Sequence, residues 1–127
     1  MVRHSVAQPD PATEFATAER CWILESWNDP DDPIVSIARA RVEVGITTQL
    51  HRLRDVVERY VIVKGSGEVH VGEMPPQMVG PGAVVVIPAG VAQRIRNTGE
   101  GDLIFYCICS PRFEPDCYEN LETWKSS

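Results

Sequence analysis

His51 and Glu58 are the residues of this sequence whose types and spacing are best suited to chemistry. A histidine and a glutamate that face the same interior can hold a divalent metal ion, because imidazole and carboxylate are both good ligands. Gln49 precedes His51 by two positions and Tyr60 follows Glu58 by two, so in extended strands each shares a face with its neighbour. His51 is therefore a candidate metal ligand with a carboxylate partner, although an ordinary strand histidine is the simpler interpretation.

A third polar residue, Gln93, extends this candidate site. In the segment 92–97 it shares a face with Ile95 and Asn97. Alternation also predicts that the arginines of these segments lie off the face of His51, Glu58 and Gln93; they are Arg52, Arg54, Arg59, Arg94 and Arg96. The predicted interior thus holds a few polar groups among apolar ones, namely Leu53, Ile62, Val84, Val86 and Ile95.

Short β-strands must position these residues. Ten prolines and nine glycines interrupt the chain at short intervals, and the stretches between them are rich in Val, Ile, Tyr and Thr. The predicted strands cover 20–27, 34–44, 47–53, 58–65, 67–72, 83–88, 92–97 and 102–109. Many short strands at near-regular spacing are typical of an antiparallel sandwich, jelly roll or closed barrel.

Length and composition describe one ordinary globular domain of 127 residues, with 43% hydrophobic and 24% charged residues. The net charge of -6 argues against a nucleic-acid or anionic-membrane partner, since both favour a basic surface. The sequence has no apolar stretch long enough to span a bilayer, and its N-terminus lacks the apolar core of a signal peptide. We therefore expect a cytoplasmic protein whose four cysteines are free thiols.

The expected domain organisation is an N-terminal arm over residues 1–17, a barrel over 18–112 and a C-terminal tail over 113–127. The tail is expected to form a short turn of helix around "YENLETW".

The spacing of the glycines relative to the polar residues carries a family resemblance. Gly45 is followed after five residues by His51, after which come Glu58 and, six residues later, Gly65. Further on, Gly82 precedes Pro88-Ala89-Gly90, Gln93 and Asn97. These residues resemble the two motifs of the cupin superfamily, G(X)5HXH(X)3,4E(X)6G and G(X)5PXG(X)2H(X)3N, over residues 45 to 97.

The resemblance implies an all-β fold, the double-stranded β-helix or jelly-roll barrel, usually as a homodimer. It also implies a metal ion held inside the barrel by the motif histidines and the glutamate. This sequence departs from the motifs twice, because Leu53 and Gln93 stand where the family has histidines.

Two interpretations of the polar site follow. In the first, Gln49, His51, Glu58 and Gln93 bind a divalent ion, with zinc, manganese, nickel and iron as candidates. A Gln-x-His pair followed by a glutamate also resembles the zinc ligands of the phosphomannose isomerases, which are cupins. In the second, His51 hydrogen-bonds to Gln93 across the barrel and no ion is needed.

Two functions remain open at this point. The protein is either an enzyme acting on a small oxygen-rich molecule, of the isomerase, lyase or dioxygenase type, or a metal-free binding protein without catalytic activity. In both cases a small-molecule ligand occupies a pocket in the barrel. The predicted pocket residues are Leu53, Tyr60, Ile62, Val86, Ile95 and Cys107.

Overall fold

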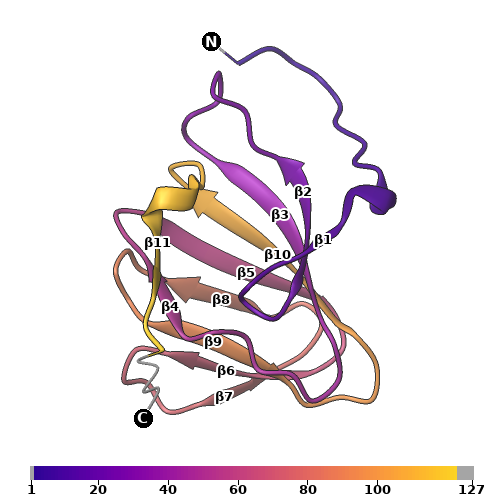
Figure 1. The fold of residues 1–127 in the computed structure, drawn as a ribbon, viewed down its shortest axis with the longest axis vertical. Helices are drawn as coiled ribbons and strands as arrows, with labels where there is room; N and C mark the ends of the chain where they lie inside the picture. Colours follow the sequence, from indigo (N-terminus) through magenta and orange to yellow (C-terminus); the bar gives the residue numbers. More distant parts are fainter. Residues whose placement is uncertain (1, 123–127) are drawn as a thin grey trace.

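The computed structural model describes residues 2–122, which form a jelly-roll barrel of two antiparallel β-sheets (Figure 1). The first sheet has the order β1-β2-β3-β10-β5-β8, with β1 (Phe15–Ala16), β2 (Trp22–Trp27), β3 (Ser36–Val42), β10 (Leu103–Ser110), β5 (Val57–Lys64) and β8 (Val84–Ile87). The second has the order β11-β4-β9-β6-β7, with β11 (Tyr118–Asn120), β4 (His51–Leu53), β9 (Gln93–Asn97), β6 (Gly67–Val71) and β7 (Gln77–Val79). Two 3-10 helices, η1 (Pro11–Thr13) and η2 (Pro115–Cys117), precede β1 and β11. The predicted all-β jelly roll is confirmed.

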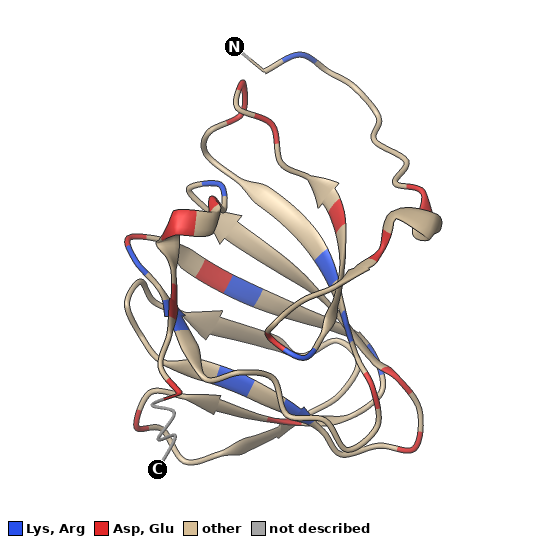
Figure 2. Cartoon of the chain, in the orientation of Figure 1, with Lys and Arg blue, Asp and Glu red and all other residues tan. Residues whose placement is uncertain are grey.

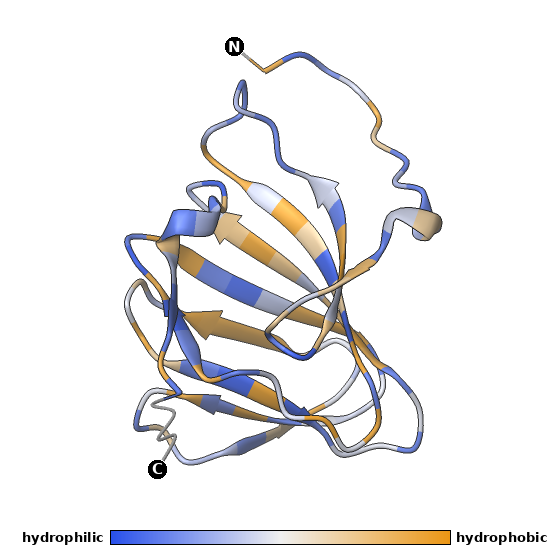
Figure 3. Cartoon of the chain, in the orientation of Figure 1, coloured by the Kyte–Doolittle hydropathy of each residue, from blue (hydrophilic) through white to orange (hydrophobic). Residues whose placement is uncertain are grey.

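Alternation along the strands decides which side chains enter the barrel. The predicted inward residues of β5 and β9 are all buried, and they are Glu58, Tyr60, Ile62, Gln93, Ile95 and Asn97. On β4, His51 and Leu53 are buried while Arg52 between them is exposed. Hydrophobic residues are accordingly concentrated on the strands, and the loops between them are more hydrophilic (Figure 3).

One part of the interior is tightly packed. Val42, Ile62, Val69, Ile95 and Leu103 belong to a single hydrophobic cluster, and each is at most 1% exposed. Burying each such side chain contributes about 1.5–3 kcal/mol. This cluster is a rigid support for the polar residues that lie on the same strands.

Two turns at this packed end have identifiable causes. Gly65 follows β5 with φ +88°, and a Cβ there would lie 2.8 Å from the carbonyl oxygen of Asp102, so only glycine fits. In the turn after β9, Asn97 donates from Nδ2 to the carbonyl oxygens of Val42 and Gly101, both at 2.8 Å, and accepts from the amide of Gly99 at 2.9 Å. Asn97 therefore ties this turn through its side chain.

The prediction of a C-terminal helical turn around "YENLETW" is wrong for the residues that the structure describes. Residues 118–120 form β11, which pairs with β4 so that Tyr118 lies opposite Leu53 and Asn120 opposite His51. The free backbone groups at the edge of β4 offer these residues hydrogen bonds in an extended conformation, which outweighs a weak local helical preference. The rest of the predicted turn, residues 123 and 124, lies outside the described residues.

The strand predictions otherwise hold, although most of the observed strands are shorter and β5 and β10 are shifted by one residue, while β1 and β7 were not predicted. The predicted orientation of β8 is wrong, since Val84 and Val86 are 59% and 56% exposed. Because β8 pairs with β5 so that Val85 lies opposite Tyr60 and Ile87 opposite Glu58, it is Val85 and Ile87 that face inward.

Charged residues of both signs are interspersed over the strands and loops of the described chain (Figure 2). Within residues 2–122, none of the helices has the length and apolar character needed to cross a membrane.

The substitution Asn97→Ala should lower the free energy of unfolding by about 3 kcal/mol, because it removes three hydrogen bonds and leaves buried backbone groups without partners. Urea unfolding followed by tryptophan fluorescence measures this change. Thr98→Ala, at the exposed neighbouring position, should change stability by less than about 0.5 kcal/mol. Equal effects of the two substitutions would contradict the role assigned to Asn97.

Candidate active site

A cavity of about 350 Å³ lies inside the barrel, beside the packed cluster. Its lining comes from β2, β3, β4, β5, β10 and β11 and from residues 15–21, 48–49 and 113–115. Six of the predicted site and pocket residues line this cavity, namely Gln49, His51, Leu53, Glu58, Tyr60 and Cys107. The barrel thus brings most of the predicted site to one cavity.

The remaining predicted residues lie elsewhere. Ile62 and Ile95 belong to the packed cluster and are not among the residues that line the cavity. Val86 points out of the barrel. Gln93 is 1% exposed and also does not line the cavity, but it hydrogen-bonds to a residue that does.

His51 is held in one tautomer by the backbone beside it. Its Nδ1 lies 2.7 Å from the carbonyl oxygen of Gln49, and since a carbonyl only accepts, Nδ1 must carry the hydrogen. In the neutral ring Nε2 is then the unprotonated, basic nitrogen. Burial lowers the pKa of His51, partly offset by this hydrogen bond, so the ring is neutral at pH 7.

The plane of the imidazole is fixed by Tyr118 of β11. The two rings stack with centroids 4.7 Å apart and an angle of 18° between their planes. The Tyr118 hydroxyl donates to Oε1 of Gln49 at 2.6 Å, so the same tyrosine also anchors the residue whose carbonyl holds His51. The ring therefore has both its tautomer and its orientation set before any ligand binds.

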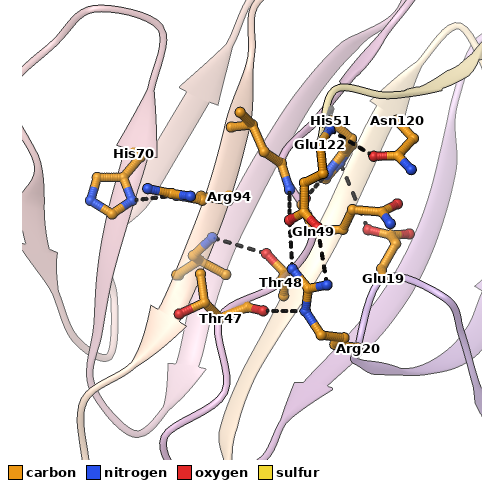
Figure 4. A network of polar contacts seen from close by, with 12 residues as sticks. Glu19, Arg20, Thr47, Thr48, Gln49, His51, His70, Arg94, Asn120 and Glu122 are labelled. Carbon is orange, nitrogen blue, oxygen red and sulfur yellow. Dashed lines mark hydrogen bonds and ion pairs between the residues drawn. The ribbon is translucent and has the colours of Figure 1, made fainter. Parts of the chain in front are cut away.

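Glu19, like Tyr118, is a site residue that the sequence analysis missed. Its Oε2 lies 3.8 Å from Nε2 of His51, which is too far for a hydrogen bond and leaves the Nε2 lone pair available (Figure 4). Burial, assisted by the charge of Glu58, raises the pKa of Glu19 to about 7. Glu19 lies in the turn between β1 and β2, where Arg20 has φ +70°, so strand alternation gave no signal for it.

Glu58 is the most deeply buried carboxyl group of the cavity, at 7% exposure. Its Oε2 accepts from the thiol of Cys109 at 3.7 Å, while its Oε1 has no hydrogen-bond partner among the described residues. Burial raises the pKa of Glu58 to about 7, although the amide of Gln93 and the thiols of Cys107 and Cys109 act in the opposite direction. The group can therefore donate or accept a proton near neutral pH.

Gln93 forms a different hydrogen bond from the one considered from the sequence. Although it lies opposite His51 in the pairing of β4 with β9, its Oε1 accepts from the Tyr60 hydroxyl. Its Nε2 is buried without a partner in the described part of the chain. The hydrogen bond between Gln93 and Tyr60 thus connects β9 to β5.

The proposed metal ligands do not fit a metal ion well as they are placed here. Gln49 and Gln93 each use their side-chain oxygen to accept from a tyrosine, so of the predicted set only His51 and Glu58 keep a donor that is not already used. Two neutral amide oxygens are also weak donors for a divalent transition metal. Within residues 2–122, no group of three or more His, Cys, Asp or Glu side chains is arranged to hold a metal ion. The metal site remains a prediction that this donor set does not favour.

This site belongs to a β-barrel of the cupin type. The family model of the cupin domain matches residues 38–109, and the chain therefore belongs to the cupin family. No curated protein sequence matches the chain.

Several solved structures share the fold. KdgF from Halomonas sp. has a TM-score of 0.75 at 17% identity, over 86% of this chain and 96% of that chain. Pac13 from Streptomyces, described as a unique nucleoside dehydratase, has a TM-score of 0.73 at 14% identity, over 92% of each chain. The capsular polysaccharide assembling protein CapF from Staphylococcus aureus has a TM-score of 0.70 at 22% identity, over 87% of this chain and 34% of that chain. At these identities the likeness is one of fold.

The substitution Glu58→Gln should flatten the pH dependence of stability. The folded-state pKa of about 7 lies above the ordinary value of 4.5, so the folded protein binds the extra proton and loses stability as pH rises from about 4.5 to 7. The variant lacks this loss, and its stability at pH 8 relative to pH 5 should exceed that of the wild type by about 1–3 kcal/mol.

Urea unfolding at the two pH values measures this difference. Glu73→Gln, which changes the same charge at an exposed position, serves as the matched control and should follow the wild type. The same pH dependence in Glu58→Gln and wild type would show that Glu58 is not the buried carboxyl group described here.

Proposed function

We propose that this cupin is a metal-independent acid–base enzyme, of the lyase or isomerase type, that acts on a small oxygen-rich molecule. His51 is the base, Glu58 is the acid, and the Glu19 carboxylate stabilises the imidazolium that forms when His51 takes up a proton. The three residues line the same cavity.

The observation that carries this proposal is the hydrogen bond from His51 Nδ1 to the Gln49 carbonyl oxygen. It commits the ring to the tautomer in which Nε2 can accept a proton, and burial keeps the ring neutral at pH 7. A general base needs this combination of an available lone pair and a fixed position. A histidine that served only to fill the core would not require its second nitrogen to remain unbonded.

Glu58 complements the base. A carboxyl group with a pKa of about 7 is protonated in about half of the molecules at neutral pH, and it can therefore deliver a proton to a leaving oxygen. Glu58 lines the same cavity as the base, and its carboxyl group is therefore the one that would donate the proton.

In the lyase reaction, Nε2 of His51 removes the proton from a carbon next to a carbonyl group. The C–H electrons form the new C=C bond, the C–O bond to a hydroxyl group on the next carbon breaks, and Glu58 protonates the departing oxygen to give water. Solvent then reprotonates Glu58 and takes the proton from His51. An isomerase shares the first step and returns the proton to a different atom.

The likeness to Pac13 supports this choice of reaction, since a dehydratase eliminates water. The support is limited to the fold and the printed activity of that protein.

The second candidate is a binding protein without catalysis, and one observation favours it. Most of the cavity lining is apolar, with Leu53 in place of a motif histidine and with Ile23, Ala38 and Phe105 beside it. Such a lining suits retention of a ligand whether or not it reacts.

A homodimer and a cytoplasmic location also remain predictions. The exposed Val63, Val84 and Val86 lie on the outer side of neighbouring strands β5 and β8 and support a dimer contact there.

Proton abstraction can be tested with model substrates in deuterated water. Glyceraldehyde, dihydroxyacetone and D-glucose are incubated with the protein, and deuterium uptake at the carbon next to the carbonyl group is followed by ¹H NMR. The wild type should accelerate exchange on at least one compound, and His51→Asn should reduce that rate about 100-fold or more. His70→Asn, at a histidine that does not line the cavity, is the matched control. No acceleration by the wild type, or an unchanged rate in His51→Asn, would contradict the proposal.

A metal-independent reaction also predicts the metal content of the purified protein. Protein purified without added metal should contain substoichiometric zinc, manganese, nickel and iron by elemental analysis, and EDTA should leave the exchange rate unchanged. A stoichiometric divalent ion that is present in the wild type and lost in His51→Asn would instead support the metal site expected from the cupin motifs.

A further inference from the structure

The cavity lining carries negative charge without any positive charge to balance it. Three glutamates, Glu19, Glu25 and Glu58, contribute to the lining, and among its described residues there is neither a lysine nor an arginine. The cavity therefore lacks the guanidinium or ammonium group with which proteins bind a carboxylate or a phosphate.

The arginines on neighbouring segments are directed elsewhere. Arg20 follows Glu19 in the chain, but its guanidinium donates to both carboxylate oxygens of Glu122, at 3.1 and 2.5 Å, and its Nε donates to the Thr47 carbonyl oxygen (Figure 4). Rotating Arg20 into the cavity would break all three hydrogen bonds.

The arginines of β3 lie on the other face of the sheet. Ala38 and Ala40 line the cavity, so Arg39 and Arg41, which alternate with them, point outward. Both pair with Glu14, at 3.3 Å from Arg39 and 2.5 Å from Arg41. These positive charges therefore cannot neutralise an anion inside the barrel.

The polar and aromatic groups of the cavity define what it can accept. Glu58 lines the cavity, and its carboxylate can accept a hydrogen bond from a ligand hydroxyl group. Phe15, Phe113 and the stacked pair of His51 and Tyr118 provide flat apolar surfaces around it. An uncharged molecule with hydroxyl groups and a planar or apolar part satisfies both features.

From this arrangement we propose that the cavity selects uncharged hydroxyl-bearing ligands and rejects their carboxylate- and phosphate-bearing analogues. The inference rests on the proposed function in that it concerns the substrate of the same site. It requires binding only, however, and can be tested without turnover.

Two matched pairs of probes test it by isothermal titration calorimetry at pH 8, where Glu19 and Glu58 are largely ionised. Uridine is compared with uridine 5′-monophosphate, and glucuronamide with glucuronate. A negative charge a few ångströms from a buried carboxylate is strongly disfavoured, so the anionic member of each pair should bind at least about 30-fold more weakly. At pH 6, where both carboxyl groups are mostly protonated, the ratio should fall.

The substitution Glu19→Gln tests whether the cavity charge causes this selectivity. It removes one negative charge while keeping the shape of the side chain, and it should reduce the ratio between neutral and anionic probes at pH 8 by about 5-fold or more. Glu100→Gln makes the same change in net charge at an exposed position outside the cavity and should leave the ratio unchanged.

Tighter binding of either anionic probe would overturn the inference, as would the absence of binding by both neutral probes at millimolar concentration. If Glu100→Gln lowers the ratio between neutral and anionic probes as much as Glu19→Gln does, the selectivity comes from the net charge of the protein. That result would also overturn the inference. The outcome is separable from that of the exchange assay. If the neutral probes bind but no deuterium exchange occurs, only the acid–base function is contradicted. If exchange occurs but the anionic probes bind more tightly, only the proposed selectivity is contradicted.

Discussion

The hydrogen bond between the His51 ring and the Gln49 carbonyl oxygen is the interaction on which the rest of the site depends. It is local, spanning two residues, and it determines which imidazole nitrogen faces the cavity with a lone pair. The stacking of Tyr118 on the ring and its hydrogen bond to the Gln49 side chain hold both partners in place. Without this arrangement, neither the tautomer nor the position of the His51 base would be fixed relative to the surrounding carboxyl groups.

The two ends of the chain complete a cavity that the barrel alone leaves open. Glu19 comes from the segment before β2, and Tyr118 comes from β11 after the last long strand. Arg20 and Glu122 join these segments through a bidentate ion pair, and Glu122 also accepts from the Leu50 amide at 2.9 Å. The barrel strands thus supply His51 and Glu58, while the terminal segments supply the groups that tune them.

Burial then turns ordinary carboxyl groups into groups that titrate near neutral pH. Removing Glu58 and Glu19 from water disfavours their charged forms, and the nearby charge of Glu58 raises the pKa of Glu19 further. The same burial lowers the pKa of His51, so base and acid coexist in the required protonation states. The stability that the protein loses by burying Glu58 is consistent with a functional role for that residue.

Sequence patterns predicted the parts of this site that follow from strand alternation. The motif spacing put His51 and Glu58 in the interior because each lies on a strand whose alternate residues are buried. Strand alternation gave the wrong orientation for β8, because its four consecutive apolar residues make both faces equally hydrophobic. Only the pairing with β5 decides that Val86 points outward. A motif also cannot specify hydrogen-bond partners, and so the bond from Tyr60 to Gln93 was not predicted.

Glu19 and Tyr118 could not be found from the sequence for a different reason. Their positions depend on tertiary contacts of the terminal segments, namely the turn before β2 and the pairing of β11 with β4. Neither segment has a periodicity that fixes where its side chains point. The predicted C-terminal helix failed at the same place, because local preference there is weak and the open edge of β4 is close by.

The protonation state of His51 tests this account most directly. Long-range ¹H–¹⁵N correlation spectra of the ¹⁵N-labelled protein at pH 7 distinguish the two ring nitrogens, with His4 and His70 as internal references. The account predicts a neutral His51 ring with the hydrogen on Nδ1 and an unprotonated Nε2. A ring protonated on Nε2, or a doubly protonated ring at that pH, would contradict it.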